Sequence, residues 1–170
     1  MCQESHRNNM MKFYDVKTLN KHFNYELNTG YSQKEQSEYE KHISVAHEIE
    51  FNERTKVLNY LSTESACLFR NYDLHDVFIK NVSVRRYVLL KRLPEIRVTV
   101  KSYHCNGVLI YKDVSRFIYD DTFTEKVFLP ECIVDELYFV DDGYIAHNYY
   151  LHPYGEINIV AKYIEWKPFE

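Results

Sequence analysis

Glycine and proline are scarce in this sequence, with four residues of each among 170. Because these two residue types mark turns and loops, their scarcity predicts long secondary-structure elements joined by short connections. The glycines are isolated from one another, so the chain has no glycine-rich loop that would bind a phosphate group. No apolar run approaches the roughly 18 residues that a membrane-spanning helix needs, and we expect no membrane partner.

Cysteine is also sparse and lies in no metal-binding pattern. Cys2, Cys67, Cys105 and Cys132 are far apart, and none belongs to a CxxC or CxxH pair. This spacing argues against a zinc site and against a redox motif, and we predict no metal and no cofactor. The sequence shows no signal peptide, so we expect reduced thiols and a cytoplasmic protein.

An excess of basic residues is missing too. The chain has 21 Lys and Arg against 25 Asp and Glu, for a formal net charge of -4, and we therefore expect no nucleic-acid partner. The charge is nevertheless uneven, since residues 80–101 are mainly basic and residues 131–170 mainly acidic. Two interpretations stay open: basic and acidic strands pair within one sheet, or the acidic half binds another protein that has a basic surface.

Aromatic residues are abundant, with 16 Tyr and 10 Phe, and aromatic side chains pack well in β-sheets. The length of the chain fits one domain. We assign residues 1–10, which are polar and show no pattern, to a flexible leader. Residues 11–170 then form a single domain, with a helical part at 11–70 and a sheet at 75–167.

Two helix starts stand out in the helical part. Ser32 followed by Glu35 is a capping box, and about thirty residues without glycine or proline come after it. Ala46 and Val57 belong to one apolar side of this segment, which predicts a long amphipathic helix. A second start at Ser62 predicts a shorter helix.

The apolar pattern changes to that of strands after residue 75. Asn106-Gly107, between two β-rich runs, predicts a hairpin turn. Because every connection is short, we expect consecutive strands to pair antiparallel as a meander. The predicted fold class is α+β, with the N-terminal helices packed on one face of a twisted antiparallel sheet. The strand-like runs are 77–84, 87–90, 96–100, 108–119, 134–140, 144–151 and 157–166.

Three residues at the transition from helices to sheet are the candidate catalytic residues: Asp73, His75 and Asp76. A histidine beside carboxylates can act as a general base, because a neighbouring carboxylate orients the imidazole and raises its pKa. The same pattern suits a structural role, in which an aspartate caps a turn and His75 hydrogen-bonds to the backbone. Both roles stay open.

The C-terminal hairpins supply the candidate binding residues, because they are acidic and rich in tyrosine. Tyrosine gives a binding surface a large contact area at low entropic cost, although the same rings can instead fill the core. The acids and histidines at the two ends of the hairpin are too far apart to share a metal ion. The candidates are Asp141, Asp142, Tyr144, His147, Tyr149 and Glu156.

Several segments carry a likeness to a known family. They are Met11-Lys12-Phe13-Tyr14, the link 72–76, Asp135-Glu136-Leu137-Tyr138, Asp142-Gly143-Tyr144, His147 and the segment 155–161. With these motifs the chain resembles an uncharacterised domain-of-unknown-function family of Gram-positive bacteria. The resemblance implies no activity, substrate or catalytic residue.

The sequence therefore predicts a non-enzymatic cytosolic domain that binds another protein, with an immunity or antitoxin-like factor as one form of this role. The alternative is a metal- or His/Asp-dependent hydrolase that uses His75 with Asp73 or Asp76. We expect a monomer or a homodimer.

Overall fold

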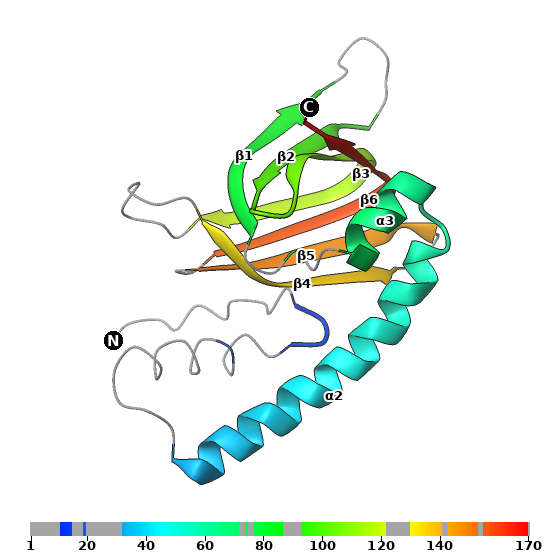
Figure 1. Cartoon of the computed structure of the whole chain (residues 1–170). Helices are drawn as coiled ribbons and strands as arrows, with labels where there is room; N and C mark the ends of the chain where they lie inside the picture. The colour runs from blue at the N-terminus through cyan, green and yellow to red at the C-terminus, as the bar shows by residue number, and fades with distance from the viewer. Residues whose placement is uncertain are drawn as a thin grey trace, which may run out of the picture.

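The computed structural model describes residues 11–14, 19, 32–71, 74, 77–86, 93–121, 130–140, 143–152 and 155–169. Within these residues, helices and a sheet form the predicted α+β fold (Figure 1), and the predicted fold class is confirmed. The elements are α2 (Gln33–Leu58), α3 (Thr63–Asn71), β1 (Val77–Arg85), β2 (Glu95–Lys101), β3 (Asn106–Asp121), β4 (Glu131–Phe139), β5 (Ile145–His152) and β6 (Gly155–Pro168).

Both described helices begin where the sequence predicts. The Ser32 hydroxyl accepts a hydrogen bond from the Glu35 backbone N–H, and the Glu35 carboxylate accepts one from the Ser32 N–H, which completes the capping box of α2. The Ser62 hydroxyl accepts from the Ser65 N–H in the same way at the start of α3. No described helix is long and apolar enough to cross a membrane.

The six strands close into an antiparallel barrel in the order β1-β2-β3-β6-β5-β4. Consecutive strands pair as expected within two sets, β1-β2-β3 and β4-β5-β6. The expected meander is wrong at one step, because β3 pairs with β6 rather than with β4. These two strands are long, and each forms backbone hydrogen bonds with the other along most of its length. The barrel then closes through a short contact, in which Val77 lies opposite Cys132 and Phe78 opposite Glu131.

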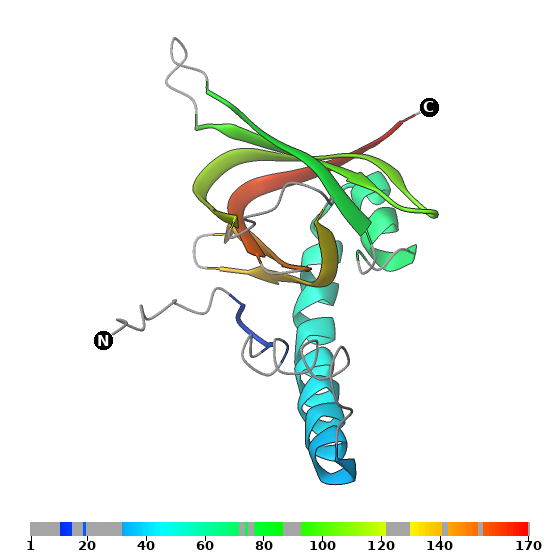
Figure 2. The same cartoon turned by 90° about the vertical axis from the view of Figure 1, so that its left-hand side faces the viewer.

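A bend in β3 and β6 divides the barrel into two halves. Asp113 has a φ of 52°, and one residue further the register shifts between Val114 and Arg116, so β3 bends here as at a β-bulge. Residues 106–111 of β3 pair with β2, whereas residues 155–161 of β6 pair with β5. Figure 2 shows the result, with β1 and β2 on one side of the barrel and β4 and β5 on the side next to α2.

The predicted hairpin between β2 and β3 exists, but its turn lies a few residues earlier in the sequence than predicted. Residues 102–105 make the turn, and Asn106 and Gly107 are the first residues of β3. Gly107 is needed for another reason than a turn conformation. A Cβ atom there would lie 2.4 Å from the Lys167 carbonyl oxygen and 2.6 Å from the Trp166 ring, so only glycine lets β6 approach β3 this closely.

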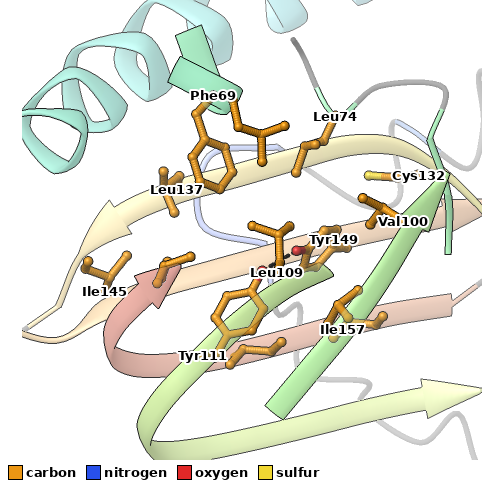
Figure 3. Close-up of a cluster of buried hydrophobic side chains, with 14 of the residues drawn as sticks. Phe69, Leu74, Val100, Leu109, Tyr111, Cys132, Leu137, Ile145, Tyr149 and Ile157 are labelled. Carbon is orange, nitrogen blue, oxygen red and sulfur yellow. Dashed lines mark hydrogen bonds between the residues drawn. The ribbon is translucent and has the colours of Figure 1, made fainter. Parts of the chain in front are cut away.

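The main core fills the barrel and is closed by α3. Figure 3 shows Phe69 of α3 and Leu74 above side chains from the strands, including Leu137, Leu109 and Ile157. A second group of buried residues covers the outside of β4 and β5, where the N-terminal segment and α2 pack against them. This group consists of Met11, Tyr14, Leu19, Ala46, Ile133 and Tyr150.

Candidate functional site

A chain of hydrogen-bonded polar side chains lies inside the barrel. The Tyr149 hydroxyl bonds to the Tyr111 hydroxyl, as Figure 3 shows. The Tyr111 oxygen lies 2.7 Å from His147 Nδ1, and His147 Nε2 lies 3.0 Å from Asp135 Oδ2. All four residues are buried. Alternation places them inward, because His147 and Tyr149 share a face of β5 with Ile145 and face the core.

Two residues of α2 extend this chain to the helix. Arg54 donates to Asp135 Oδ2 at 2.9 Å and to the Asp135 carbonyl oxygen at 3.0 Å. The Arg54 Nε also donates to Glu50 Oε1 at 2.7 Å, and Glu50 in turn accepts from the Leu137 N–H at 3.1 Å. The helix thus satisfies two backbone groups of β4 that face away from β5, where β1 no longer pairs with β4. We call Glu50, Arg54, Tyr111, Asp135, His147 and Tyr149 the inner network.

Burial and charge set the protonation of the inner network. Burial alone would raise the pKa of Asp135, but Arg54 and His147 outweigh it and hold the pKa at about 2. Burial lowers the pKa of His147 against the opposing effect of Asp135. A neutral His147 donates from Nε2 to Asp135 and accepts at Nδ1 from the Tyr111 hydroxyl, and Tyr111 then accepts from Tyr149. Every hydroxyl and imidazole proton of the chain therefore has an acceptor.

Glu50 differs from Asp135 although both carboxylates contact Arg54. Burial, the largest effect, raises the pKa of Glu50 to about 7, with the charge of Arg54 opposing and that of Asp135 adding to the rise. Two carboxylates that share one guanidinium cannot both be stabilised fully as anions. Glu50 is therefore the residue of the inner network that exchanges a proton near neutral pH.

The order Asp135–His147–Tyr111 is that of a base that activates a hydroxyl nucleophile. Two observations argue against such a role here. Burial raises the pKa of both Tyr111 and Tyr149 well above the usual range, so their protons are held more tightly than in water. Tyr111, His147 and Tyr149 are also closed off from solvent, out of reach of a substrate. The inner network is arranged to join α2 to the barrel rather than to react.

A second polar cluster holds the N-terminal segment on the outside of β4 and β5. The Glu136 carboxylate accepts hydrogen bonds from three successive backbone N–H groups, those of Lys12 (2.6 Å), Phe13 (2.6 Å) and Tyr14 (2.9 Å). The Asn148 side chain also donates to Glu136 at 2.9 Å, and Asn158 donates to Asn148. Glu136, Asn148 and Asn158, which lie in register across three strands, form what we call the outer cluster.

The outer surface of the other half of the barrel is open to solvent. Outward-facing side chains of β1 and β2 alternate with core residues and are exposed or partly exposed, except for Glu95, which is buried. The same surface continues over residues 106–112 of β3, where Ile110 is also buried, and over 163–168 of β6. We call these outward-facing side chains the open face. Among the described helices, α2 packs on β4 and α3 packs on β6.

The candidate catalytic residues Asp73, His75 and Asp76 lie outside the described residues. Among the residues that the structure does describe, no group of three or more His, Cys, Asp or Glu side chains is placed to hold a metal ion. Cys67 and Cys105 are free thiols, and the Cys132 thiol lies 3.6 Å from the Val134 carbonyl oxygen.

The candidate binding residues that the structure describes are either buried or half-buried. Asp141 and Asp142 lie outside the described residues. His147 and Tyr149 are buried in the inner network, so neither side chain reaches a surface where a partner would bind. Tyr144 is half-buried beside the outer side chains of β4 and β5, and Glu156 is half-buried opposite Tyr150.

Three acids of the C-terminal half have partners within the protein. Asp135 and Glu136 are buried in the two polar clusters, and Glu165 forms an ion pair with Lys112 on the neighbouring strand. This last contact matches the interpretation in which basic and acidic strands pair within one sheet.

Sequence reasoning missed Glu50 and Arg54, although a signal for them exists. They lie at the same helical phase as Ala46 and Val57, so a charged pair interrupts the apolar side of α2. A charged pair on a buried helix face implies a partner on the element that the helix covers. Asp135 on β4 is that partner.

Comparison of the chain with models of protein families and with curated proteins found no match.

We predict that Glu50→Gln changes the pH dependence of stability. Glu50 holds its proton up to a pKa of about 7 in the folded state, against 4.5 unfolded, so the folded state binds more protons between these pH values. Its contribution to stability is full below pH 4.5 and is lost as the pH rises to 7. The free energy of unfolding of wild type, relative to that of Glu50→Gln, should therefore fall by on the order of 2 kcal/mol across this window.

Urea denaturation of both proteins measures this difference. The neighbours of Glu50 do not give the same profile: Asp135 titrates near 2, the pKa values of Tyr14 and Arg54 are raised far above the window, and His147 has a lowered pKa and the opposite slope. Glu48→Gln, an exposed change on the same helix, is the control. Parallel curves for wild type and Glu50→Gln would contradict the assignment.

We predict that Glu136→Ala releases the N-terminal segment. Hydrogen bonds to a charged acceptor contribute about 1.5–3 kcal/mol each, and the backbone N–H groups of Lys12, Phe13 and Tyr14 share this one carboxylate. Hydrogen exchange at these three amides should become at least about tenfold faster, while exchange in the barrel strands stays slow. Glu131→Ala, a change at a partly exposed residue of the same strand, is the control. Equal acceleration throughout the barrel would show that Glu136 stabilises the whole fold instead.

Proposed function

We propose that this chain is a non-enzymatic domain that binds another protein through the open face. The observation that carries the proposal is the contrast between the two halves of the barrel. Outside β4 and β5 the surface is covered by α2 and the N-terminal segment, whereas outside β1 and β2 it is exposed. A rigid sheet with a well-ordered exposed face suits recognition, because little conformational entropy is lost on binding.

The composition of the open face supports the same role. Tyr163 on β6 is 44% exposed and Phe78 on β1 is 37% exposed, and Arg97 on β2 lies between them with its side chain partly exposed. Aromatic residues and arginine are enriched in protein–protein interfaces. The hydrolase alternative rests on Asp73, His75 and Asp76, which lie outside the described residues.

An immunity or antitoxin-like factor is the specific form of this role that we propose, with membership in the Gram-positive family that the chain resembles. Asp135, Glu136 and His147, which carry part of that resemblance, build the inner network and the outer cluster. The resemblance therefore supports a shared fold more than a shared site. Identification of the partner as a toxin would support the finer role.

Site-specific photo-crosslinking tests the proposed face without assuming the chemistry of the partner. A p-benzoyl-phenylalanine in place of Thr99, half-buried at the centre of the open face on β2, should crosslink one stoichiometric protein in a native lysate. The same residue in place of Ser37, exposed on α2, is the control and should not crosslink that protein.

If position 99 gives no crosslinked protein, or the same set of proteins as position 37, the proposal is wrong. Circular dichroism of both variants, which should match that of wild type, is the check that a negative result concerns binding rather than folding.

A further inference from the structure

The open face has a charge opposite to that of the whole chain. Five bases and two acids face outward there, for a formal charge of +3, whereas the chain carries -4. The remaining residues therefore carry -7. Such segregation on one sheet surface creates a local positive potential that the net charge conceals. The bases are Arg85, Arg97, Lys101, Lys112 and Lys167, and the acids are Glu95 and Glu165.

The two acids are already paired with two of the bases. Arg97 donates to the Glu95 carboxylate at 2.7 Å, and Lys112 pairs with Glu165 across β3 and β6. No ion pair joins Lys101 or Lys167 to a carboxylate of the described residues, and both lysines are exposed. Glu131 lies on the same side, opposite Phe78 on β4, so the described residues at this end carry two lysines against one carboxylate and have a net positive charge.

Strand register brings these two lysines to one place. Lys101 lies opposite Asn106 on β3 and Lys167 lies opposite Val108, so a single strand separates them. Two strand spacings across the sheet and two residues along β3 amount to roughly 12 Å, a distance at which two flexible ammonium groups can contact the same short segment of a partner. Phe78, opposite Lys101 on β1, and Phe169, 56% exposed, add apolar surface beside them.

We propose that the end of the open face with Lys101 and Lys167 binds an acidic segment of a protein partner. This inference rests on the proposed function and names the chemistry of the partner. Carboxylates of the partner would neutralise the two lysines, and the exposed aromatic rings would contact its carbon atoms. This partner has the opposite charge to the basic one that the sequence alone suggests, because Asp135 and Glu136 are buried and Glu165 is paired with Lys112.

The positions of Glu131 and Glu165 favour a protein over a nucleic acid. Both carboxylates are partly exposed on the same side as the lysines: Glu165 lies on β6, and Glu131 lies opposite Phe78 on β4, two strands from Lys101. A nucleic-acid strand that crossed this face would bring its uniform row of phosphates close to them, at an electrostatic cost. A protein surface can place carboxylates opposite the lysines and neutral or basic groups opposite the two glutamates.

Fluorescence anisotropy with a labelled short poly-L-glutamate peptide tests this inference. Wild type should bind the peptide, and the binding should weaken as the salt concentration rises from about 50 to about 200 mM. Lys101→Glu/Lys167→Glu should bind at least tenfold more weakly. The control Lys34→Glu/Lys41→Glu, which makes the same change in net charge at exposed positions of α2, should bind like wild type.

Three outcomes would overturn the inference: no binding of the peptide to wild type, equal losses in the two double variants, or equally tight binding of a poly-dT oligonucleotide that is lost with Lys101 and Lys167. These results are distinct from failure of the proposed function. If a partner crosslinks at position 99 while poly-L-glutamate does not bind, the open face is an interface but its partner is not acidic. If neither occurs, both proposals fail.

Discussion

The edge of β4 imposes the constraint on which the rest of this fold depends. Strands β1 and β4 close the barrel through two residue pairs only, so further along β4 the backbone groups on that side need other partners. Glu50 and Arg54 of α2 supply them by bonding to the Leu137 N–H and the Asp135 carbonyl oxygen. Side chains of α2 thus form the hydrogen bonds to β4 that a neighbouring strand would otherwise form.

Several other features follow from this contact. Once Arg54 is placed at the edge of β4, its charge allows Asp135 to be buried as an anion, and Asp135 then fixes the tautomer of His147. The helix, held at this angle, covers the outer side of β4 together with the N-terminal segment bound by Glu136. Both polar clusters therefore stabilise the same half of the barrel and leave the open face free.

Local features of this fold could be predicted from the sequence, because the residues that decide them lie within a few positions of one another. The starts of both described helices could be predicted, one from the capping box of Ser32 and Glu35 and the other from Ser62. Alternation located the strands, and placed His147 on the same face as Tyr149. The turn near Asn106 was misplaced by a few residues, because the close approach at Gly107 depends on β6, sixty residues away in the sequence.

Long-range features could not be predicted. A strand with an alternating pattern is compatible with several neighbours, so the pattern does not show that β3 pairs with β6. The burial of Asp135 and Glu136 could not be predicted, since nothing nearby in the sequence shows that Arg54 and the N-terminal backbone are their partners. The open face was missed for the same reason, because its bases come from four strands.

A double-mutant cycle on Arg54 and Asp135 tests most directly whether their contact holds the helix on the barrel. The free energy of unfolding is measured for wild type, Arg54→Met, Asp135→Asn and the double variant. Removal of one partner from a buried ion pair costs about 3–5 kcal/mol, so each single variant should be strongly destabilised. The double variant should cost much less than the sum, with a coupling energy of about 2 kcal/mol or more. Additive effects of the two substitutions would contradict the account.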